Sequence, residues 1–423
     1  MTEILMTKQV TKEMEDRYIE IPFDMPPSVN TLEVSYEIVD KGTTRSIVDL
    51  GIRDEKRVRG WSGGARKHFY ISKEKATPGY LPGPLTPGKW AVLLGTYRIA
   101  KAGCEVKVNI RFQLAQSRWY KGDLHTHTVH SDGKYELQEV VQIAGKIGLD
   151  FVALTDHNTI TQNLVYPKEN ELTFIPGMEL TTNHGHCNFL GVIDPVLDFR
   201  STSDAQVLER ILEAKKNGAF VVLNHPHCPY CPWEWSFDVP YDAVEIWNGP
   251  WRESNQHTLD WWQNQLVQGR KIVAVGGSDV HAPHPYVKHG HPTTWIYSKG
   301  KDASSLLSAL GRGHVFITYF PVAPIVSLCC EDKMMGDTVV NPSDSVTIDI
   351  QGLQINDVIR IYTRQGKTYE SIAAGPVWKK EFLSKQSGFV RVEVWRKFTG
   401  FDVLLPVTIT NPLYIEKKAH SFI

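Results

Sequence analysis

The segment WYKGDLHTHTVHSDG (119–133) decides the fold class, because it ends a predicted β-strand in a group of potential metal ligands. Side chains alternate along an extended chain, so His125 and His127 face the same side and can bind one ion. Asp132 follows in the turn-like sequence HSDG. The same arrangement, an apolar strand that ends in a ligand, recurs along the chain as far as residue 281.

Four further segments carry potential ligands at or near the end of an apolar run. In chain order they supply His157 at the end of LDFVALTDH, Glu179 in TFIPGMELTT with His186 close behind it in HCNFLGV, His225 after AFVVLN, and Asp279 with His281 after KIVAVGGS. The carboxyl ends of parallel strands meet at one edge, so we expect ligands that are far apart in the sequence to lie together.

The chemistry of this set predicts a catalytic metal centre. Imidazoles and carboxylates without thiolates suit Zn²⁺, Mn²⁺ or Fe²⁺ in a catalytic rather than a structural site. The nine candidate ligands exceed what one ion can use, and a carboxylate such as Glu179 can bridge two ions. We therefore expect two or three divalent metal ions.

Helical patterns separate the predicted strands in the central part of the chain, at 137–148, 203–218, 254–269 and 303–313. Strands that alternate with helices imply parallel βα units, either in a barrel or in a doubly wound sheet. The flanking parts are rich in short alternating runs and turns, which is typical of all-β domains. We expect an N-terminal β-sandwich domain over 1–117, an α/β domain over 118–320 and a C-terminal β-rich domain over 321–423.

Composition excludes several classes of protein. The chain has 46 basic and 47 acidic residues, so no basic field favours a nucleic acid polymer as partner. The start lacks the apolar run of a signal peptide, and no stretch is long and apolar enough to span a membrane. The six cysteines lack the dense spacing of a disulfide framework. We expect a cytoplasmic protein that acts on a small molecule; the sequence does not give its oligomeric state.

The motifs DLHTHTVHSDG, ALTDHN, GMELTT, NHP and GSDVH resemble, in this order, the metal motifs of the PHP (polymerase and histidinol phosphatase) superfamily. The resemblance covers roughly residues 119–320. Within the superfamily the chain looks most like the CehA/McbA-like branch, through GHCN (185–188), VEIWN (244–248) and the leading β domain. It implies a distorted (βα)7 PHP barrel flanked by the two β domains.

The resemblance also implies how the ligands are shared among the ions. His125, His127, Glu179 and Asp279 would hold one ion, Asp132, His157 and His281 a second, and Glu179 with His186 and His225 a third. In the sequence HGH, His184 is a rival to His186, and His186 is the one that matches the motif.

The activity that the resemblance implies is hydrolysis of a phosphate mono- or diester by attack of a metal-bridging hydroxide. The alternative is a carboxyl or carbamate ester hydrolase that uses the same site. Besides Glu179, two residues are candidates for catalytic roles. Asp156 would orient a ligand, shuttle a proton or stabilise the strand end, and Arg252 would bind the substrate phosphate or act as a general acid.

Two other motifs suggest different chemistry. GWSGG (60–64) fits the G-x-S-x-G nucleophile motif, but that motif needs a following helix, and a strand pattern follows here. Cys228 and Cys231 form a C-x-x-C sequence, which is typical of a metal or redox pair but also occurs in ordinary loops. A binding protein with a vestigial metal centre is a further alternative, against which the complete ligand set argues.

Overall fold

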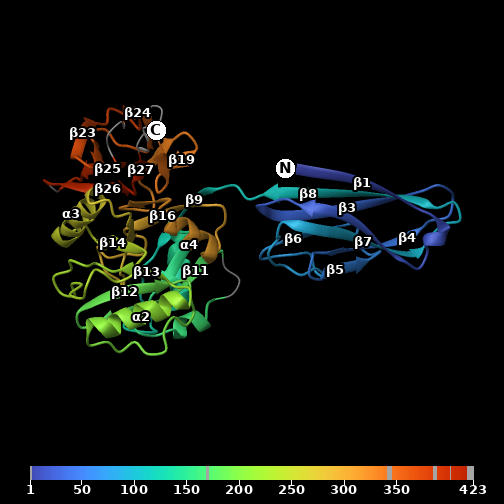
Figure 1. The fold of residues 1–423 in the computed structure, drawn as a ribbon, viewed down its shortest axis with the longest axis horizontal. Helices are drawn as coiled ribbons and strands as arrows, with labels where there is room; N and C mark the ends of the chain where they lie inside the picture. Colours follow the sequence, from blue (N-terminus) through green and yellow to red (C-terminus); the bar gives the residue numbers. More distant parts are fainter. Residues whose placement is uncertain (1, 168–170, 341–344, 384–387, 401, 417–423) are drawn as a thin grey trace, which may run out of the picture. The chain divides into compact units, whose positions relative to one another are not determined.

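The computed structural model describes residues 2–167, 171–340, 345–383, 388–400 and 402–416. The chain forms two compact units, Met1–Gln116 and Ser117–Ile423. Strands outnumber helices in both units, and the four α-helices among the described residues all belong to the second one (Figure 1). The last seven residues of the predicted C-terminal domain lie outside the described residues.

The first unit consists of two four-stranded antiparallel sheets, with the strand orders β1-β8-β3-β6 and β2-β7-β4-β5. The strands are β1 (Thr2–Val10), β2 (Tyr18–Met25), β3 (Val29–Asp40), β4 (Ile47–Arg53), β5 (Val58–Gly63), β6 (His68–Ser72), β7 (Gly88–Arg98) and β8 (Cys104–Leu114). Buried and exposed residues alternate along β3 and β8, as expected for strands with one face on a core. Ser62 of GWSGG lies in β5, and the next element is the strand β6 instead of the helix that a nucleophile motif needs.

The second unit is built on a mixed sheet that begins with seven strands in the order β15-β14-β13-β12-β11-β10-β9. They are β9 (Arg118–Asp123), β10 (Phe151–Leu154), β11 (Thr173–Thr182), β12 (Gly185–Leu190), β13 (Phe220–Leu223), β14 (Ala243–Asn248) and β15 (Val273–Gly277). Neighbouring strands are parallel except around β12, which runs antiparallel to β11 and β13. The first residues of β12 therefore lie at the edge where the other six strands end.

All four predicted helices are present: α1 (Leu137–Ile147), α2 (Asp204–Lys216), α3 (Glu253–Val267) and α4 (Ala303–Gly311). In α2, the buried residues Val207, Ile211 and Ala214 recur at helical spacing and form one apolar face. The side chain of Ser203 accepts a hydrogen bond from the backbone N–H of Gln206 and so caps the start of α2. Among the described residues, every helix is too short or too polar to cross a membrane.

The (βα)7 barrel that the resemblance implies is not shown by this structure. Within the described part of the seven-strand segment, three of the connections between strands contain an α-helix, namely α1, α2 and α3. A short turn joins β11 to β12, and the other described connections are loops or the 3-10 helix η2 (Thr161–Leu164). The two outer strands of the segment nevertheless meet where they end. The N–H of Asp279 donates to the carbonyl of His125 (2.9 Å), and the N–H of His127 donates to the carbonyl of Val280 (3.1 Å).

After residue 320, all described secondary-structure elements are strands. The large sheet continues from β9 through β16 (Thr293–Ser298), β17 (Val315–Thr318), β26 (Leu404–Thr410), β25 (Phe389–Lys397) and β22 (Val358–Thr363) to β23 (Gly366–Ile372), with β27 (Leu413–Glu416) and β20 (Thr338–Val340) beside it. A separate sheet has the order β19 (Lys333–Met334), β18 (Ile325–Cys330), β21 (Ser345–Gln351) and β24 (Val377–Leu383). The boundary predicted at residue 320 thus falls inside one sheet, and the three-domain division stays a prediction.

Candidate metal centre

All seven strands of the segment from β15 to β9 bring a histidine or an acidic side chain to the same edge of the sheet. His125 and His127 follow β9, His157 follows β10, Glu179 lies in β11, His186 lies in β12, His225 follows β13, Glu245 lies in β14, and Asp279 and His281 follow β15. Asp132 belongs to the loop after His127. The structure therefore brings the nine predicted ligands into one cluster.

The first group of this cluster is formed by His125, His127, Glu179 and Asp279. Nε2 of His125 lies 3.3 Å from Oε1 of Glu179 and 3.3 Å from Oδ1 of Asp279. Nε2 of His127 lies 3.1 Å from the same oxygen of Asp279. One ligand atom each of His125, His127 and Asp279 lie within 4.8 Å of one another, so one ion can contact all three.

The imidazoles of this group have buried nitrogen atoms that no described residue hydrogen-bonds. His125 and His127 are almost completely buried, and their Nε2 atoms have no hydrogen-bond partner among the residues that the structure describes. A buried polar atom that lacks a partner costs about 1–3 kcal/mol. A divalent ion would provide the missing partner for both nitrogens, so these residues fit a metal site.

The carboxylates give the group a charge that attracts a cation. Burial raises the pKa of Glu179, but the neighbouring His125, His157 and His186 outweigh burial and hold the pKa well below its usual value. Burial likewise raises the pKa of Asp279, and His125 and His127 outweigh it and lower the pKa well below the usual value. Both carboxylates are therefore ionised in the metal-free protein.

A second group is formed by His127, Asp132, His157 and His281, which each place one ligand atom within 4.8 Å of the others. Oδ1 of Asp132 lies 3.6 Å from Nε2 of His157 and 3.4 Å from Nε2 of His281. These two nitrogens are 3.4 Å apart, which is close to the separation of two nitrogens that bind one tetrahedral Zn²⁺ at about 2.0–2.1 Å. The side chain of Asp132 is 62% exposed, so solvent reaches the centre at this group.

The third predicted set also converges on Glu179. Oε1 of this residue lies 3.3 Å from Nδ1 of His186 and 3.7 Å from Nε2 of His225. His184, the rival to His186, is exposed, and its Nδ1 lies 2.6 Å from Glu234. The structure thus places the histidine that matches the motif beside the central carboxylate.

Glu245 is a site residue that the sequence analysis did not identify. Its Oε1 lies 3.0 Å from Nδ1 of His125, and its Oε2 accepts a hydrogen bond of 3.1 Å from the backbone N–H of His225. A carboxylate on the outer nitrogen of a ligand histidine fixes the ring and its tautomer. The signal in the sequence is an acidic residue inside the otherwise apolar strand AVEIWN, where an unpaired charge is costly.

Glu245→Gln is expected to weaken metal binding about 10- to 100-fold, the usual effect of losing the carboxylate behind a ligand histidine. Competition with a chromogenic chelator measures the affinity. Glu253→Gln is the matched control, because this side chain is 88% exposed at the start of α3. Equal affinities of the two variants would show that Glu245 does not support His125.

Amide groups and a second buried acid complete the surroundings of the ligands. Asn224 donates a hydrogen bond of 2.7 Å to Glu179, and Asn248 donates one of 3.2 Å to Asp279. Asp123, whose pKa burial raises to about 6, accepts hydrogen bonds from the backbone N–H groups of His125, Ser278 and Gly290. Asn and Asp at strand ends are common in any protein, so the sequence alone gives no reason to select them.

Close approach of β15 and β9 depends on a glycine. A Cβ atom on Gly277 would lie 2.4 Å from Cβ of His125 and 2.5 Å from Oε1 of Glu245, so any other residue would displace the first ligand. His225 and Asp279 themselves have positive φ angles of 29° and 52°, a conformation that costs on the order of 1–3 kcal/mol for non-glycine residues. Such backbone strain at candidate ligands is consistent with a functional site.

Asp156 and Arg252, the other candidates for catalytic roles, lie in different surroundings. Asp156 is buried and accepts hydrogen bonds from the backbone N–H and the hydroxyl of Thr128 and from the hydroxyl of Ser131. These contacts favour the orienting role, because they hold the loop that carries Asp132. Arg252 is exposed at the N-cap of α3, and its contact with substrate stays a prediction.

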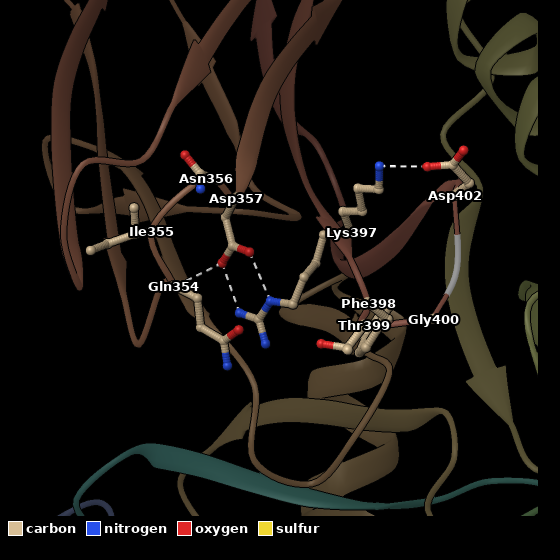
Figure 2. A pocket seen from close by; sticks show the side chains of 10 residues that line it. Gln354, Ile355, Asn356, Asp357, Lys397, Phe398, Thr399, Gly400 and Asp402 are labelled. Atoms are coloured by element: carbon tan, nitrogen blue, oxygen red, sulfur yellow. Dashed lines mark hydrogen bonds and ion pairs between the residues drawn. The ribbon is translucent and has the colours of Figure 1, made fainter.

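A cavity of about 600 Å³ lies beside the C-terminal strands, and none of the predicted ligands lines it (Figure 2). Its charged side chains pair with one another: Arg396 with Asp357 at 2.7 Å and Lys397 with Asp402 at 2.6 Å. The charges in this cavity are therefore neutralised within it. The candidate site is the cluster at the strand ends, where the buried Nε2 atoms of His125 and His127 have no hydrogen-bond partner in the described part of the chain.

Metal binding is expected to release protons at neutral pH. Burial lowers the pKa of His225, but Glu179, Asp279 and Glu245 outweigh burial and raise it to about 9. The same carboxylates raise the pKa of His125 well above its usual value against the effect of burial. Both rings are thus protonated in the metal-free protein and must lose their protons to bind an ion, so the affinity should increase as the pH rises toward about 9.

Calorimetric titration with Zn²⁺ or Mn²⁺ in two buffers of different ionisation enthalpy measures the released protons. The two buffers should give different apparent enthalpies of binding. The same enthalpy in both buffers would contradict the protonation of His125 and His225.

Comparisons with known proteins find a matching family model and a similar protein sequence. Residues 123–223 match the family model of the PHP domain. An uncharacterized protein of Methanocaldococcus jannaschii is 30% identical over 149 residues, which cover 31% of this chain and 84% of that protein.

Two solved structures resemble parts of this chain, both with low sequence identity and low TM-scores. One is a two-domain protein from Bacteroides vulgatus described as containing a predicted PHP-like metal-dependent phosphoesterase, with 17% identity, a TM-score of 0.41 and coverage of 69% of this chain and 95% of that one. The other is an amidohydrolase from Chromobacterium violaceum, with 14% identity, a TM-score of 0.27 and coverage of 40% and 89%. Taken with the family model and the archaeal relative, the strand-end cluster of histidines and carboxylates shows that this chain belongs to the PHP superfamily.

Proposed function

We propose that this chain is a metal-dependent hydrolase with two or three divalent ions, and that its substrate is a phosphate mono- or diester. One observation carries the proposal: the buried Nε2 atoms of His125 and His127 face Glu179 and Asp279 and have no hydrogen-bond partner among the described residues. Imidazole and carboxylate ligands suit Zn²⁺, Mn²⁺ and Fe²⁺, and availability in the cell selects among such ions.

The residues that would hold the ions follow from the three groups. His125, His127, Glu179 and Asp279 would bind the first ion, Asp132, His157 and His281 the second, and Glu179, His186 and His225 the third. When bound, divalent ions supply a water nucleophile that is active near neutral pH and neutralise charge that develops on the substrate.

The protein's own contribution is to position these ligands. Glu245 holds Nδ1 of His125, so that Nε2 of the ring points toward Glu179 and Asp279. Asn224 and Asn248 fix the orientation of the two carboxylates. Such preorganised polar groups lower the cost of reorganisation during the reaction. Exposed Arg252 would bind a phosphate oxygen of the substrate.

We further assign the chain to the CehA/McbA-like branch of the superfamily. The two short motifs that suggest this branch supply residues of the cluster: His186 of GHCN lies beside Glu179, and Glu245 of VEIWN lies behind His125. The alternative within this proposal is a carboxyl or carbamate ester as substrate. Trp247 of the tryptophan-rich segment 231–251 is fully buried, which indicates packing and gives no support to an aromatic-accepting pocket.

Side-by-side assays of bis-p-nitrophenyl phosphate, p-nitrophenyl phosphate and naphthyl carbamate, with Mn²⁺ or Zn²⁺, test the proposal. We expect metal-dependent hydrolysis of a phosphate ester that is lost in His125→Ala and kept in His257→Ala, a control on the exposed side of α3. Hydrolysis of the carbamate without hydrolysis of either phosphate ester would favour the alternative substrate class. No metal-dependent hydrolysis of any of the three would count against the proposed function.

A further inference from the structure

The loop after β13 carries two thiols beside the candidate metal centre. Cys228 and Cys231 are both partly buried, and their sulfur atoms lie 3.3 Å apart. Sγ of Cys231 also lies 3.7 Å from Nδ1 of His225. The C-x-x-C sequence is therefore in direct contact with a predicted ligand, which distinguishes it from a pair of small side chains in an ordinary loop.

Hydrogen bonds hold this loop against the cluster. The N–H of Cys228 donates to the carbonyl of His225 (2.8 Å), and the N–H of Trp233 donates to the carbonyl of Pro226 (3.0 Å). The N–H of Asn224 donates to the carbonyl of His186 (3.1 Å), which ties the start of the loop to β12. The two histidines and the cysteine loop thus belong to one hydrogen-bonded frame.

The geometry fits three ligands of one ion. One ligand atom each of His186, His225 and Cys231 lie within 4.8 Å of one another. Bond lengths of about 2.3 Å to sulfur and about 2.0–2.1 Å to nitrogen place the two ligand atoms of a tetrahedral zinc site roughly 3.6 Å apart. The 3.7 Å between Sγ of Cys231 and Nδ1 of His225 is close to this value.

We propose that Cys231 is a thiolate ligand of a divalent cation that His186 and His225 also bind. The inference rests on the proposed metal centre and places its third ion on the side of His225 that faces Cys231, where sulfur takes the place of Glu179 as a ligand. The thiol proton passes to solvent when the ion binds. Because thiolates favour Zn²⁺ and similar ions over Mn²⁺ and Mg²⁺, this position selects a softer ion than the group that contains Asp132.

The ring of His225 has two sides that lead to different sites. Its Nδ1 faces Cys231, whereas its Nε2 lies 3.7 Å from Oε1 of Glu179. An ion on the Nδ1 side would bind sulfur directly. With an ion on the Nε2 side, Cys231 would only orient the ring and would form no bond to metal. A measurement that detects the metal–sulfur bond separates these two arrangements.

Titration of the metal-free full chain with Co²⁺, in a reducing buffer, provides this measurement. We expect a near-ultraviolet sulfur-to-cobalt charge-transfer band in addition to the visible bands of bound Co²⁺. Cys231→Ser should lose the charge-transfer band and keep visible bands from the remaining ions. Cys228→Ser is the matched control, because it makes the same change in the same loop, and it should keep both kinds of band.

Visible bands without a charge-transfer band in the wild-type chain would overturn the inference and leave the metal centre intact. A charge-transfer band that persists in Cys231→Ser would also overturn it. If the wild-type chain binds no Co²⁺ at all and shows no metal-dependent hydrolysis with Zn²⁺ or Mn²⁺, the proposed function fails together with the inference.

Discussion

Glu179→Gln is expected to lower kcat/KM for a phosphate ester by about 1000-fold or more. A loss of this size corresponds to several kcal/mol of metal-dependent stabilisation of the transition state. The side chain of Glu179 is buried at the centre of the cluster. Its two oxygens lie 3.3 Å from Nε2 of His125 and 2.8 Å from Nδ1 of His157. The amide keeps the size of the side chain but removes the charge that two or more ions would share.

Steady-state kinetics with bis-p-nitrophenyl phosphate and the metal content of the purified variant measure this effect together. Glu209→Gln is the control, because its side chain is 65% exposed on α2. Activity and metal content of Glu179→Gln that match those of the control would show that this carboxylate is not a shared ligand.

Removal of metal by a chelator is expected to abolish hydrolysis and to lower the thermal stability of the second unit. An ion at 100 times its Kd stabilises the folded state by about 2.7 kcal/mol, which corresponds to a shift in Tm of about 5 °C for a unit of this size. Without an ion, the buried Nε2 atoms of His125 and His127 would have no hydrogen-bond partner among the described residues. Dialysis against Zn²⁺ or Mn²⁺ should restore both activity and stability.

Thermal unfolding of the chelated and reconstituted protein checks the stability, and the same samples give the activity. Glu179→Gln should show a much smaller shift on addition of metal. Identical unfolding temperatures with and without metal, in a wild-type chain that is fully active in both states, would contradict a catalytic metal centre.

The ligand cluster could be predicted from the sequence because most of the ligands lie at or near the end of an apolar run. His125 with His127 and Asp279 with His281 have the two-residue spacing of an extended chain, and parallel strands end at one edge. The four helices could be predicted from their periodic patterns and caps. These signals are local in sequence, so tertiary structure is not needed to detect them.

Other features depend on contacts that no local pattern encodes. The antiparallel direction of β12 puts His186 beside Glu179, whereas alternating strands and helices predict parallel βα units. The role of Glu245 depends on its distance from His125, which lies 120 residues earlier in the chain. The strands after residue 320 extend the sheet of the metal centre, a pairing between segments that are distant in sequence.

The contact of Cys231 with His225 is another feature that the sequence alone does not reveal. C-x-x-C spacing does not distinguish an ordinary loop from a metal or redox pair, and the distance to His225 carries the further inference. The sequence offers Arg252 as a candidate for binding the substrate phosphate, but its exposed N-cap location leaves its contact with substrate as a prediction.

The most direct measurement is anomalous diffraction from crystals of the reconstituted protein, at the absorption edge of zinc or manganese. The account predicts at least two anomalous peaks within the cluster, one of them in contact with His125, His127, Glu179 and Asp279. Crystals grown with saturating metal that show no anomalous peak among these four side chains would contradict it.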